Sequence, residues 1–219
     1  MSDSRLETIE AFLMDKDLKE LEKKLDQFDL FRILKIASRE VTMSSILAWI
    51  LDPNESHNMG DYFLRQFLLN IIIQNKSNEH LNSRVFSIIN LDILNLSDIY
   101  VQTEEVFSNK RRGDISLVDN SNKIYILIEN KIFSGEGDSQ TTSYYQEAQK
   151  RYEGYDKLFV YLTPDGDSPE DPHFLPLSYS TIKDLLVDLM ENKRDELSES
   201  SYLVIDQMKK NIDDNITEQ

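Results

Sequence analysis

An aspartate, a glutamate and a lysine occur at a spacing that could hold a metal ion and direct a water molecule. In segment 123–131, side chains that alternate between two faces place three isoleucines on one face and Glu129 with Lys131 on the other. Asp114 opens the preceding segment, and a turn at residues 119–122 would bring it back beside Glu129. Carboxylates are preferred Mg²⁺ ligands, so the two acids could share a divalent cation. Lys131 could then orient a nucleophilic water or offset charge in a transition state.

The same residues have a simpler interpretation. Glu129 and Lys131 could form an ion pair at a strand end that performs no chemistry. A bare Asp…Glu-x-Lys pattern is frequent by chance, so the pattern alone does not separate the two interpretations. The order of the surrounding elements therefore has to decide between them.

Apolar periodicity predicts the elements that would position these side chains. Helical spacing or strand-like composition marks each of them. Helices are predicted over residues 4–24, 43–51, 61–74, 139–152, 181–193 and 202–212. Strands are predicted over residues 99–107, 114–118, 123–131 and 157–162. No repeat, low-complexity block or linker interrupts them, so residues 1–219 are predicted to form a single domain.

Seven short motifs in this order resemble the PD-(D/E)XK nuclease superfamily. They are Arg39-Glu40, Ser44–Pro53, His57-x-x-Gly60, Arg112-Gly-Asp114, Ile128–Ile132, Gln140-x-x-x-Tyr144 and Tyr161–Gly166. The resemblance covers residues 39–166 as the core. It leaves residues 1–38 as an N-terminal helical addition and residues 167–219 as C-terminal helices.

The resemblance implies both a fold and a reaction. The fold would be α/β, with a restriction-endonuclease-like αβββαβ core in which helices flank a mixed sheet, plus N-terminal and C-terminal helical additions. The reaction would be Mg²⁺-dependent hydrolysis of phosphodiester bonds in DNA. Mn²⁺ would substitute for Mg²⁺, and RNA stays open as an alternative substrate. Defence against foreign DNA, or repair, is the setting that it suggests.

The resemblance also assigns roles to residues of the quoted motifs. Asp114 and Glu129 would hold the metal ion, and Glu40 would reach it directly or through water. Lys131 would position the attacking water, and Gln140 would line the site. Each of these five residues would then belong to the catalytic machinery.

Two further residues are candidates for substrate binding. Arg112 would contact phosphate and Tyr144 would support the site beside the substrate. An arginine that holds Asp114 or a loop carboxylate is an equally good interpretation of Arg112. His57 is better explained as a brace of its own loop than as a substrate contact.

The composition limits the class of protein. The 219 residues include 40 Asp and Glu against 24 Lys and Arg, and the formal net charge is −16. This acidity argues against a protein that coats nucleic acid, since phosphate binding needs clustered Lys and Arg. It also motivates an alternative, a catalytically silent protein of the same fold that acts as a regulatory or protein-binding module. The absence of cysteine excludes disulfides and thiolate metal sites.

The N-terminal sequence bears on location and partners. It is acidic within three residues and has no apolar segment typical of a secretory signal, and no apolar run approaches the length of a membrane span. A cytoplasmic protein without a membrane partner is therefore predicted. The N-terminal helices leave two alternatives open, an interface between identical subunits and a site for another protein.

Overall fold

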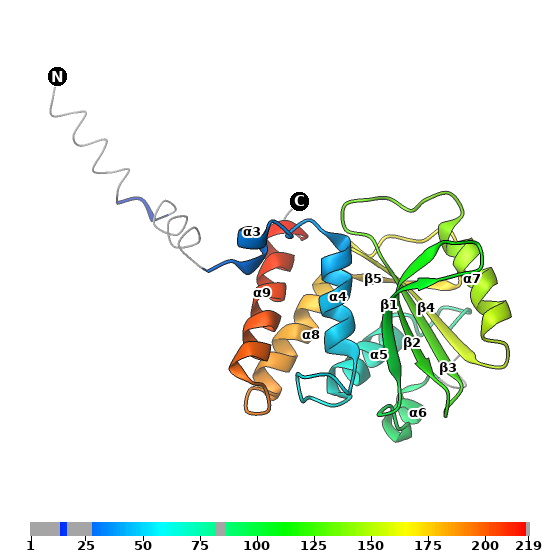
Figure 1. Cartoon of the computed structure of the whole chain (residues 1–219). Coiled ribbons are helices and arrows are strands. Elements are labelled where there is room, and N and C mark those ends of the chain that lie inside the picture. The colour runs from blue at the N-terminus through cyan, green and yellow to red at the C-terminus, as the bar shows by residue number, and fades with distance from the viewer. Residues whose placement is uncertain (1–13, 17–27, 82–85, 218–219) are drawn as a thin grey trace.

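The fold is organised around one five-stranded sheet (Figure 1). The computed structural model describes residues 14–16, 28–81 and 86–217. In sheet order the strands are β1 (Tyr100–Val106), β2 (Arg112–Asp119), β3 (Ile124–Asn130), β4 (Asp156–Thr163) and β5 (Phe174–Ser178). The first three pair antiparallel, whereas β3, β4 and β5 pair parallel. The predicted mixed sheet is confirmed.

Helices cover both faces of this sheet. In the described ranges they are α3 (Leu30–Leu34), α4 (Glu40–Leu51), α5 (Tyr62–Gln74), α6 (Ile88–Ile93), α7 (Gln140–Arg151), α8 (Tyr179–Asn192) and α9 (Glu199–Asn215). The larger core joins the sheet to α4, α5, α8 and α9, and α7 covers the opposite face (Figure 1). The helix predicted over residues 4–24 lies outside the described residues, except for 14–16.

The α4 helix forms where the apolar stripe predicted it. Met43, Leu47 and Leu51 are fully buried against the sheet, because side chains three or four residues apart share one helix face. The helix ends at Leu51, and Asp52 adopts extended backbone geometry, as expected for a residue before proline. The start of α4 therefore lies at one end of the sheet, where Glu40 is its first residue.

The β2–β3 hairpin brings the chemistry-bearing residues together. Its register runs from Asp119 opposite Ile124 to Ile115 opposite Ile128. The Asn122 N–H donates to Asp119 Oδ1 over 2.8 Å, so the turn has the side-chain chemistry that the sequence predicted. All residues of β3 are buried, because the strand is central and covered on both faces.

Three elements were not predicted: α3, α6 and β5. In β5, a proline in the middle of a short segment argues against a strand. Pro176 is tolerated because β5 is the last strand of the described sheet and one of its edges needs no N–H donor. Its parallel pairing with β4 extends the sheet beyond residue 166, and α8 follows it directly.

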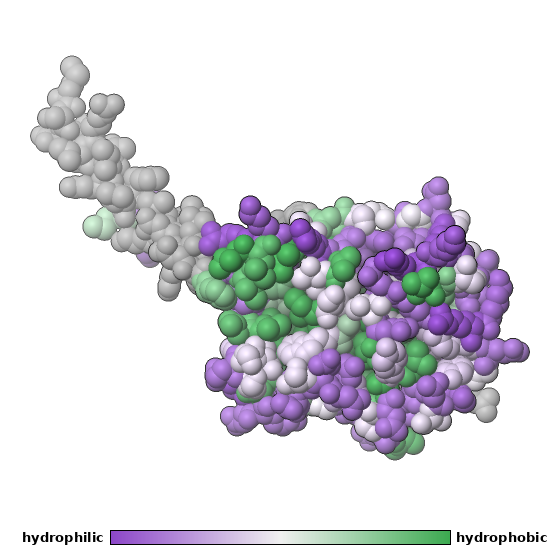
Figure 2. Space-filling model, in the orientation of Figure 1, coloured by the Kyte–Doolittle hydropathy of each residue, from purple (hydrophilic) through white to green (hydrophobic). Residues whose placement is uncertain are grey.

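Apolar side chains are exposed around α3. Phe28, Ile33 and Leu34 are each more than half exposed. Figure 2 shows an apolar cluster over the region of α3 and α9, and smaller apolar patches elsewhere on the same face. A subunit or protein interface at this end of the chain remains a prediction. Within the ranges that the structure describes, no helix has the length and apolar character needed to cross a bilayer.

Candidate active site

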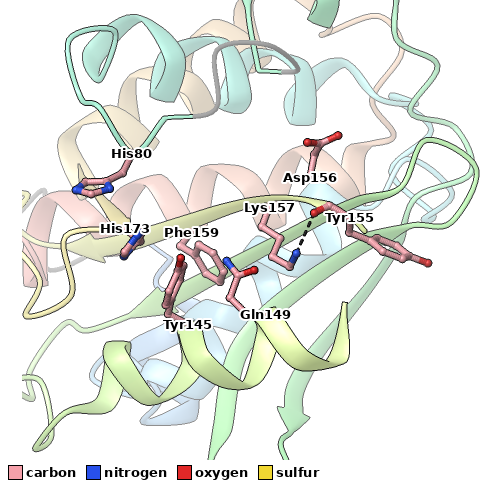
Figure 3. Close-up of a pocket in the computed structure, with 8 residues that line it drawn as sticks. All are labelled: His80, Tyr145, Gln149, Tyr155, Asp156, Lys157, Phe159 and His173. Carbon is pink, nitrogen blue, oxygen red and sulfur yellow. Dashed lines mark hydrogen bonds between the residues drawn. The ribbon is translucent and has the colours of Figure 1, made fainter. Parts of the chain in front are cut away.

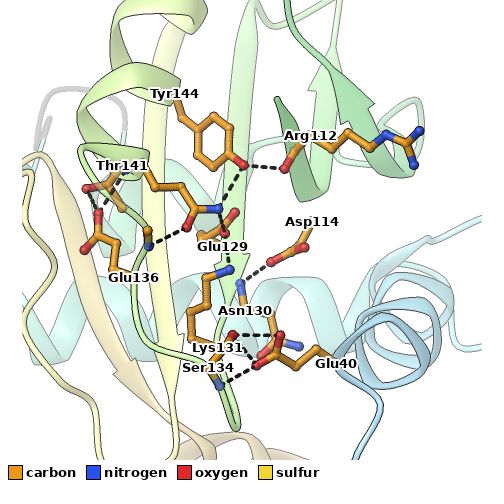
Figure 4. Close-up of polar contacts among 12 residues, drawn as sticks. Glu40, Arg112, Asp114, Glu129, Asn130, Lys131, Ser134, Glu136, Thr141 and Tyr144 are labelled. Carbon is orange, nitrogen blue, oxygen red and sulfur yellow. Dashed lines mark hydrogen bonds and ion pairs between the residues drawn. The ribbon is translucent and has the colours of Figure 1, made fainter. Parts of the chain in front are cut away.

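Asp114 and Glu129 lie opposite each other on adjacent strands. Since Ile115 pairs with Ile128, the next pair toward the strand end is Asp114 with Glu129. Residues opposite each other in an antiparallel pair point to the same face, so both carboxylates lie on the α7 side of the sheet. The Asn130 N–H donates to Asp114 Oδ2 over 2.7 Å and fixes that carboxylate (Figure 4).

The Glu129 side chain is fully buried and is bonded through one oxygen only. Lys131 Nζ lies 2.9 Å from Glu129 Oε1, and the Gln140 amide donates to the same atom over 2.6 Å. Oε2 is buried and has no hydrogen-bond partner among the described residues. A buried acceptor without a donor is costly, so this oxygen is suited to a ligand that the chain does not supply.

Burial and neighbouring charges set the protonation of Glu129, Asp114 and Lys131. Burial, with the Asp114 carboxylate adding to it, raises the pKa of Glu129 to about 8 against the opposing effect of Lys131. Burial also raises the pKa of Asp114, although the Asn130 N–H and the Lys131 ammonium oppose that rise. For Lys131, burial alone would lower the pKa, but Glu129 and Asp114 outweigh it and the pKa is raised. Lys131 is therefore a fixed positive charge beside two carboxylates that resist full ionisation.

These residues fit a hard divalent cation. Within the described ranges, no three His, Cys, Asp or Glu side chains are close enough together to hold a metal ion. Mg²⁺ commonly takes only one or two protein carboxylates and fills its other positions with water and substrate oxygens. Asp114 and the unpartnered Oε2 of Glu129 meet that smaller requirement.

Glu40 anchors the loop that follows β3. Its Oε1 accepts from the N–H groups of Ile132 (2.8 Å), Phe133 (3.0 Å) and Ser134 (3.2 Å). Burial alone would raise the pKa of Glu40, but these donors outweigh it and the pKa is lowered. The carboxylate is thus anionic and ties the start of α4 to the loop after β3 (Figure 4). Its predicted contact with a metal ion remains a prediction.

Gln140, Tyr144 and Arg112 form a chain of contacts beside Glu129. Besides donating to Glu129, the Gln140 amide donates to the Tyr144 hydroxyl over 3.0 Å, and that hydroxyl donates to the Arg112 carbonyl. Tyr144 is buried, and the Arg112 guanidinium turns away to pair with Glu104 at 2.9 Å (Figure 4). Gln140 therefore contacts Glu129 directly, whereas Arg112 takes part only through its backbone carbonyl. Substrate contact by Arg112 or Tyr144 remains a prediction.

A local distortion of β1 frames Asp114. Thr103 pairs with Ile115 and Glu105 pairs with Gly113, but Glu104 between them has a left-handed backbone with φ of 52°. Glu104 therefore lies opposite Asp114 with no residue inserted in either strand, and its backbone departs from extended geometry there.

A family model described as the PD-(D/E)XK nuclease superfamily matches residues 28–218. The chain belongs to this superfamily. The match extends beyond the predicted core of residues 39–166 and includes α3, β5, α8 and the whole of α9. Searches of curated proteins and of solved structures gave no significant match.

Membership of the PD-(D/E)XK nuclease superfamily has consequences for fold and chemistry. The mixed sheet flanked by helices is the restriction-endonuclease-like fold that the sequence predicted. Members are nucleases, hence hydrolases with nucleic-acid substrates, and they generally use divalent metal ions. The two carboxylates and Lys131 lie on β2 and at the end of β3, as the motif resemblance implied.

Sequence reasoning missed residues that support the PD-(D/E)XK motif from a distance. The buried Asn130 amide donates to Ser44 Oγ on α4, and its oxygen accepts from the Tyr179 hydroxyl on α8. These bonds hold the end of β3 between two helices. Ser44 was part of a quoted motif, but no local pattern could identify Tyr179, which lies 49 positions from Asn130.

Glu136 has a supporting role that a local pattern could have shown. The Ser139 side chain makes no capping bond at the start of α7, and Glu136 Oε1 accepts from the Thr141 N–H over 3.0 Å instead. Its other oxygen accepts from the Glu170 N–H over 2.8 Å. Acidic residues before a helix are a recognised start signal, so this cap was predictable in principle.

The interpretation of His57 as a brace is confirmed. The ring is buried, its Nε2 lies 2.7 Å from the Asp52 carbonyl, and the Met59 N–H donates to Nδ1 over 3.1 Å. Burial lowers the pKa of His57, which favours the neutral ring that these two bonds require.

Proposed function

We propose that this chain is a metal-dependent nuclease that hydrolyses phosphodiester bonds of DNA, with Mg²⁺ as its metal ion. The observation that carries the proposal is the buried Glu129 carboxylate, which lies opposite Asp114, pairs with Lys131 at 2.9 Å and leaves Oε2 without a partner. An ion pair that served structure alone would gain nothing from a second buried carboxylate beside it, because like charges raise each other's pKa.

Each residue has a distinct part in this proposal. A bound divalent cation supplies Lewis-acid stabilisation of the phosphate and makes water a stronger nucleophile. Asp114 and Glu129 would hold that ion, with Glu40 as the residue that fixes the loop beside it. Lys131 has a raised pKa, so it acts as a protonated hydrogen-bond donor to water or phosphate and not as a general base.

Gln140 would act on the reaction through Glu129. Its amide donates to Glu129 Oε1 and thereby leaves Oε2 facing the place where a cation would bind. The Tyr144 hydroxyl in turn orients the amide. The neutral Gln140 amide thus holds Glu129 in position, as residues that hydrogen-bond to metal ligands commonly do.

The test is cleavage of matched single-stranded DNA, duplex DNA, supercoiled plasmid and RNA, with Mg²⁺, Mn²⁺ or EDTA. We expect DNA cleavage with either metal ion and none in EDTA. Asp114→Asn and Glu129→Gln are expected to lose activity by about a thousand-fold or more, since each removes a charged ligand. The matched control is Asp98→Asn, an exposed residue in the turn before β1, which should cleave like the wild type.

Two outcomes would reject the proposal. Cleavage that persists in EDTA and in Asp114→Asn would indicate a contaminating or metal-independent activity. Folded wild-type protein that cleaves no nucleic acid with any of these ions would favour the catalytically silent alternative. Preferential cleavage of RNA would retain the mechanism and replace the substrate.

A further inference from the structure

A cavity outside the catalytic group lies between α7, the start of β4 and the residue before β5 (Figure 3). Its volume is about 230 Å³. Aromatic rings and a few polar groups line it, namely His80, Tyr145, Gln149, Tyr155, Asp156, Lys157, Phe159 and His173. We refer to these residues as the ring pocket. None of them has a role in the proposed reaction.

One side of the ring pocket is a stack of aromatic rings. The Tyr145 and His173 rings stack at 3.9 Å between centroids with 16° between their planes. His80 lies 4.4 Å from His173 on a tilted plane, and Phe159 meets Tyr145 edge-on at 5.4 Å. Asp171 Oδ1 lies 2.8 Å from His173 Nδ1, so the central ring is held in one orientation. Planar walls of this kind select flat ligands.

The polar groups of the ring pocket offer donors and acceptors to such a ligand. The Gln149 amide and the Tyr145 hydroxyl make no hydrogen bond with any residue that the structure describes. Lys157 donates to the Tyr155 carbonyl over 2.9 Å and has further N–H donors. An amide that both donates and accepts matches the edge of a nucleobase.

Charge and size argue against other ligands. The Asp156 carboxylate lies beside the single ammonium of Lys157 in this lining, and Asp171 adds a second carboxylate behind His173, which disfavours a phosphate group. No three metal-ligating side chains come together anywhere in the described ranges, which disfavours a metal ion. The cavity is smaller than the range typical of drug-sized ligands, so it fits one ring system.

We propose that the ring pocket binds one unpaired nucleobase of a nucleic-acid strand. The proposal rests on the proposed nuclease function and adds a substrate feature, a single-stranded segment. α7 connects the two places, because Gln140 contacts Glu129 and Gln149 lines the ring pocket. The helix rises about 13 Å between these residues, a distance that a strand of a few nucleotides can span.

The test measures binding in EDTA, where no cleavage occurs. The probes are a single-stranded oligonucleotide with one internal 2-aminopurine, its blunt duplex, and 2-aminopurine deoxynucleoside monophosphate. We expect the single strand to bind with quenched fluorescence, because the base stacks on a ring. Gln149→Ala and His173→Ala should weaken this binding about ten-fold and remove the quenching, since stacking and edge contacts each contribute about that much.

The matched control is Gln146→Ala, another exposed glutamine of α7 that does not line the ring pocket. It should bind like the wild type, and blunt duplex should bind equally to all variants. Single-strand binding and quenching that are unchanged in folded Gln149→Ala would overturn the ring-pocket assignment while leaving the nuclease proposal intact. A monophosphate that binds as tightly as the strand would also overturn it, in favour of a free nucleotide. Absence of any nucleic-acid binding or cleavage by the wild type would reject both proposals.

Discussion

At the scale of single residues, the distinguishing feature is a glutamate whose side chain is fully buried. Glu129 has a pKa of about 8 in the folded chain against an ordinary value of 4.5. A group whose pKa is raised by folding binds its proton more tightly in the folded state. Its stabilising contribution is therefore complete below about pH 4.5 and is lost as the pH rises through about 8.

The first prediction concerns the pH dependence of stability in EDTA. The melting temperature of the wild type should fall between about pH 6 and about pH 9. In a chain of this size, each kcal/mol lost from the free energy of unfolding lowers the melting temperature by roughly 2–4 °C. Glu129→Gln cannot ionise and should lose less stability over the same range. Thermal melts of both proteins test this, and parallel curves would contradict it. Adding Mg²⁺ should stabilise the wild type more at about pH 8 than at about pH 6, because the cation displaces a proton.

The second prediction concerns Lys131. Lys131→Met should lower kcat by about a hundred- to a thousand-fold, because a fixed donor at the developing charge is lost. KM for DNA should change little, since the side chain is only 14% exposed and is paired with Glu129. Steady-state kinetics with Lys209→Met as the control on α9 separate the two parameters. A change confined to KM would show that Lys131 binds substrate and does not assist the reaction.

At the scale of elements, the loop after β3 is held by one side chain from the start of α4. The third prediction uses this contact. Glu40→Ala leaves the N–H groups of Ile132, Phe133 and Ser134 without their acceptor and should destabilise the fold by about 1–3 kcal/mol. Glu40→Gln keeps an acceptor oxygen and should retain more stability.

Comparing these two variants separates anchoring of the loop from metal binding. If Glu40 acts only as an anchor, Glu40→Gln should keep most of the cleavage rate at saturating Mg²⁺. If the side chain binds the metal ion, Glu40→Gln should be stable but should need much more Mg²⁺ for half-maximal rate. A titration of rate against Mg²⁺ concentration distinguishes the two roles.

The fourth prediction concerns the glycine before Asp114. A Cβ on Gly113 would lie 2.7 Å from Leu127 Cδ1, and Leu127 is fully buried and cannot move aside easily. Gly113→Ala should therefore destabilise the protein by about 1–3 kcal/mol and lower activity, because β2 shifts against β3 and takes Asp114 with it. Gly135→Ala is the control, since its Cβ would meet no atom within 4 Å. Equal melting temperatures for the two variants would contradict the prediction.

Helices and strands whose apolar residues recur with the period of a helix or a strand could be predicted from the sequence. The α4 stripe and the β2–β3 hairpin belong to this class, and so does the position of Glu129 relative to Lys131. β5 was missed because Pro176 makes a short strand look like a loop. The bonds from Glu40 to residues 132–134 join positions more than 90 residues apart, and only the fold brings them together.

At the scale of the whole molecule, the acidic composition extends to the surroundings of the site. Arg112 pairs with Glu104, Arg151 with Glu105, and Lys150 lies near Glu147. The positive charges of these three side chains are therefore compensated by nearby carboxylates. With a net charge of −16, the protein has little long-range attraction for nucleic acid.

The fifth prediction follows from this compensation. Binding of DNA in EDTA should be weak. Ca²⁺ also binds carboxylate oxygens, and we expect it to support no cleavage. Replacing EDTA with Ca²⁺ should therefore strengthen DNA binding at least about ten-fold. The slope of log affinity against log salt should have a magnitude of about 2–4, well below the value of about 10 for a strongly basic repressor. Fluorescence anisotropy over a salt series measures both. A steep slope in EDTA would contradict the prediction and indicate a basic surface that pairs with phosphate.

The left-handed residue in β1 has a consequence for association between molecules. Among the described strands β1 pairs only with β2, so its other edge offers amide groups to any extended chain, and Tyr100 and Val106 at its ends are 60% and 55% exposed. Such an edge is a template for aggregation. Glu104 interrupts this row with a left-handed backbone, and such irregularities at an edge hinder the pairing of an incoming strand. The distortion opposite Asp114 thus also makes this edge a poorer template for an added strand.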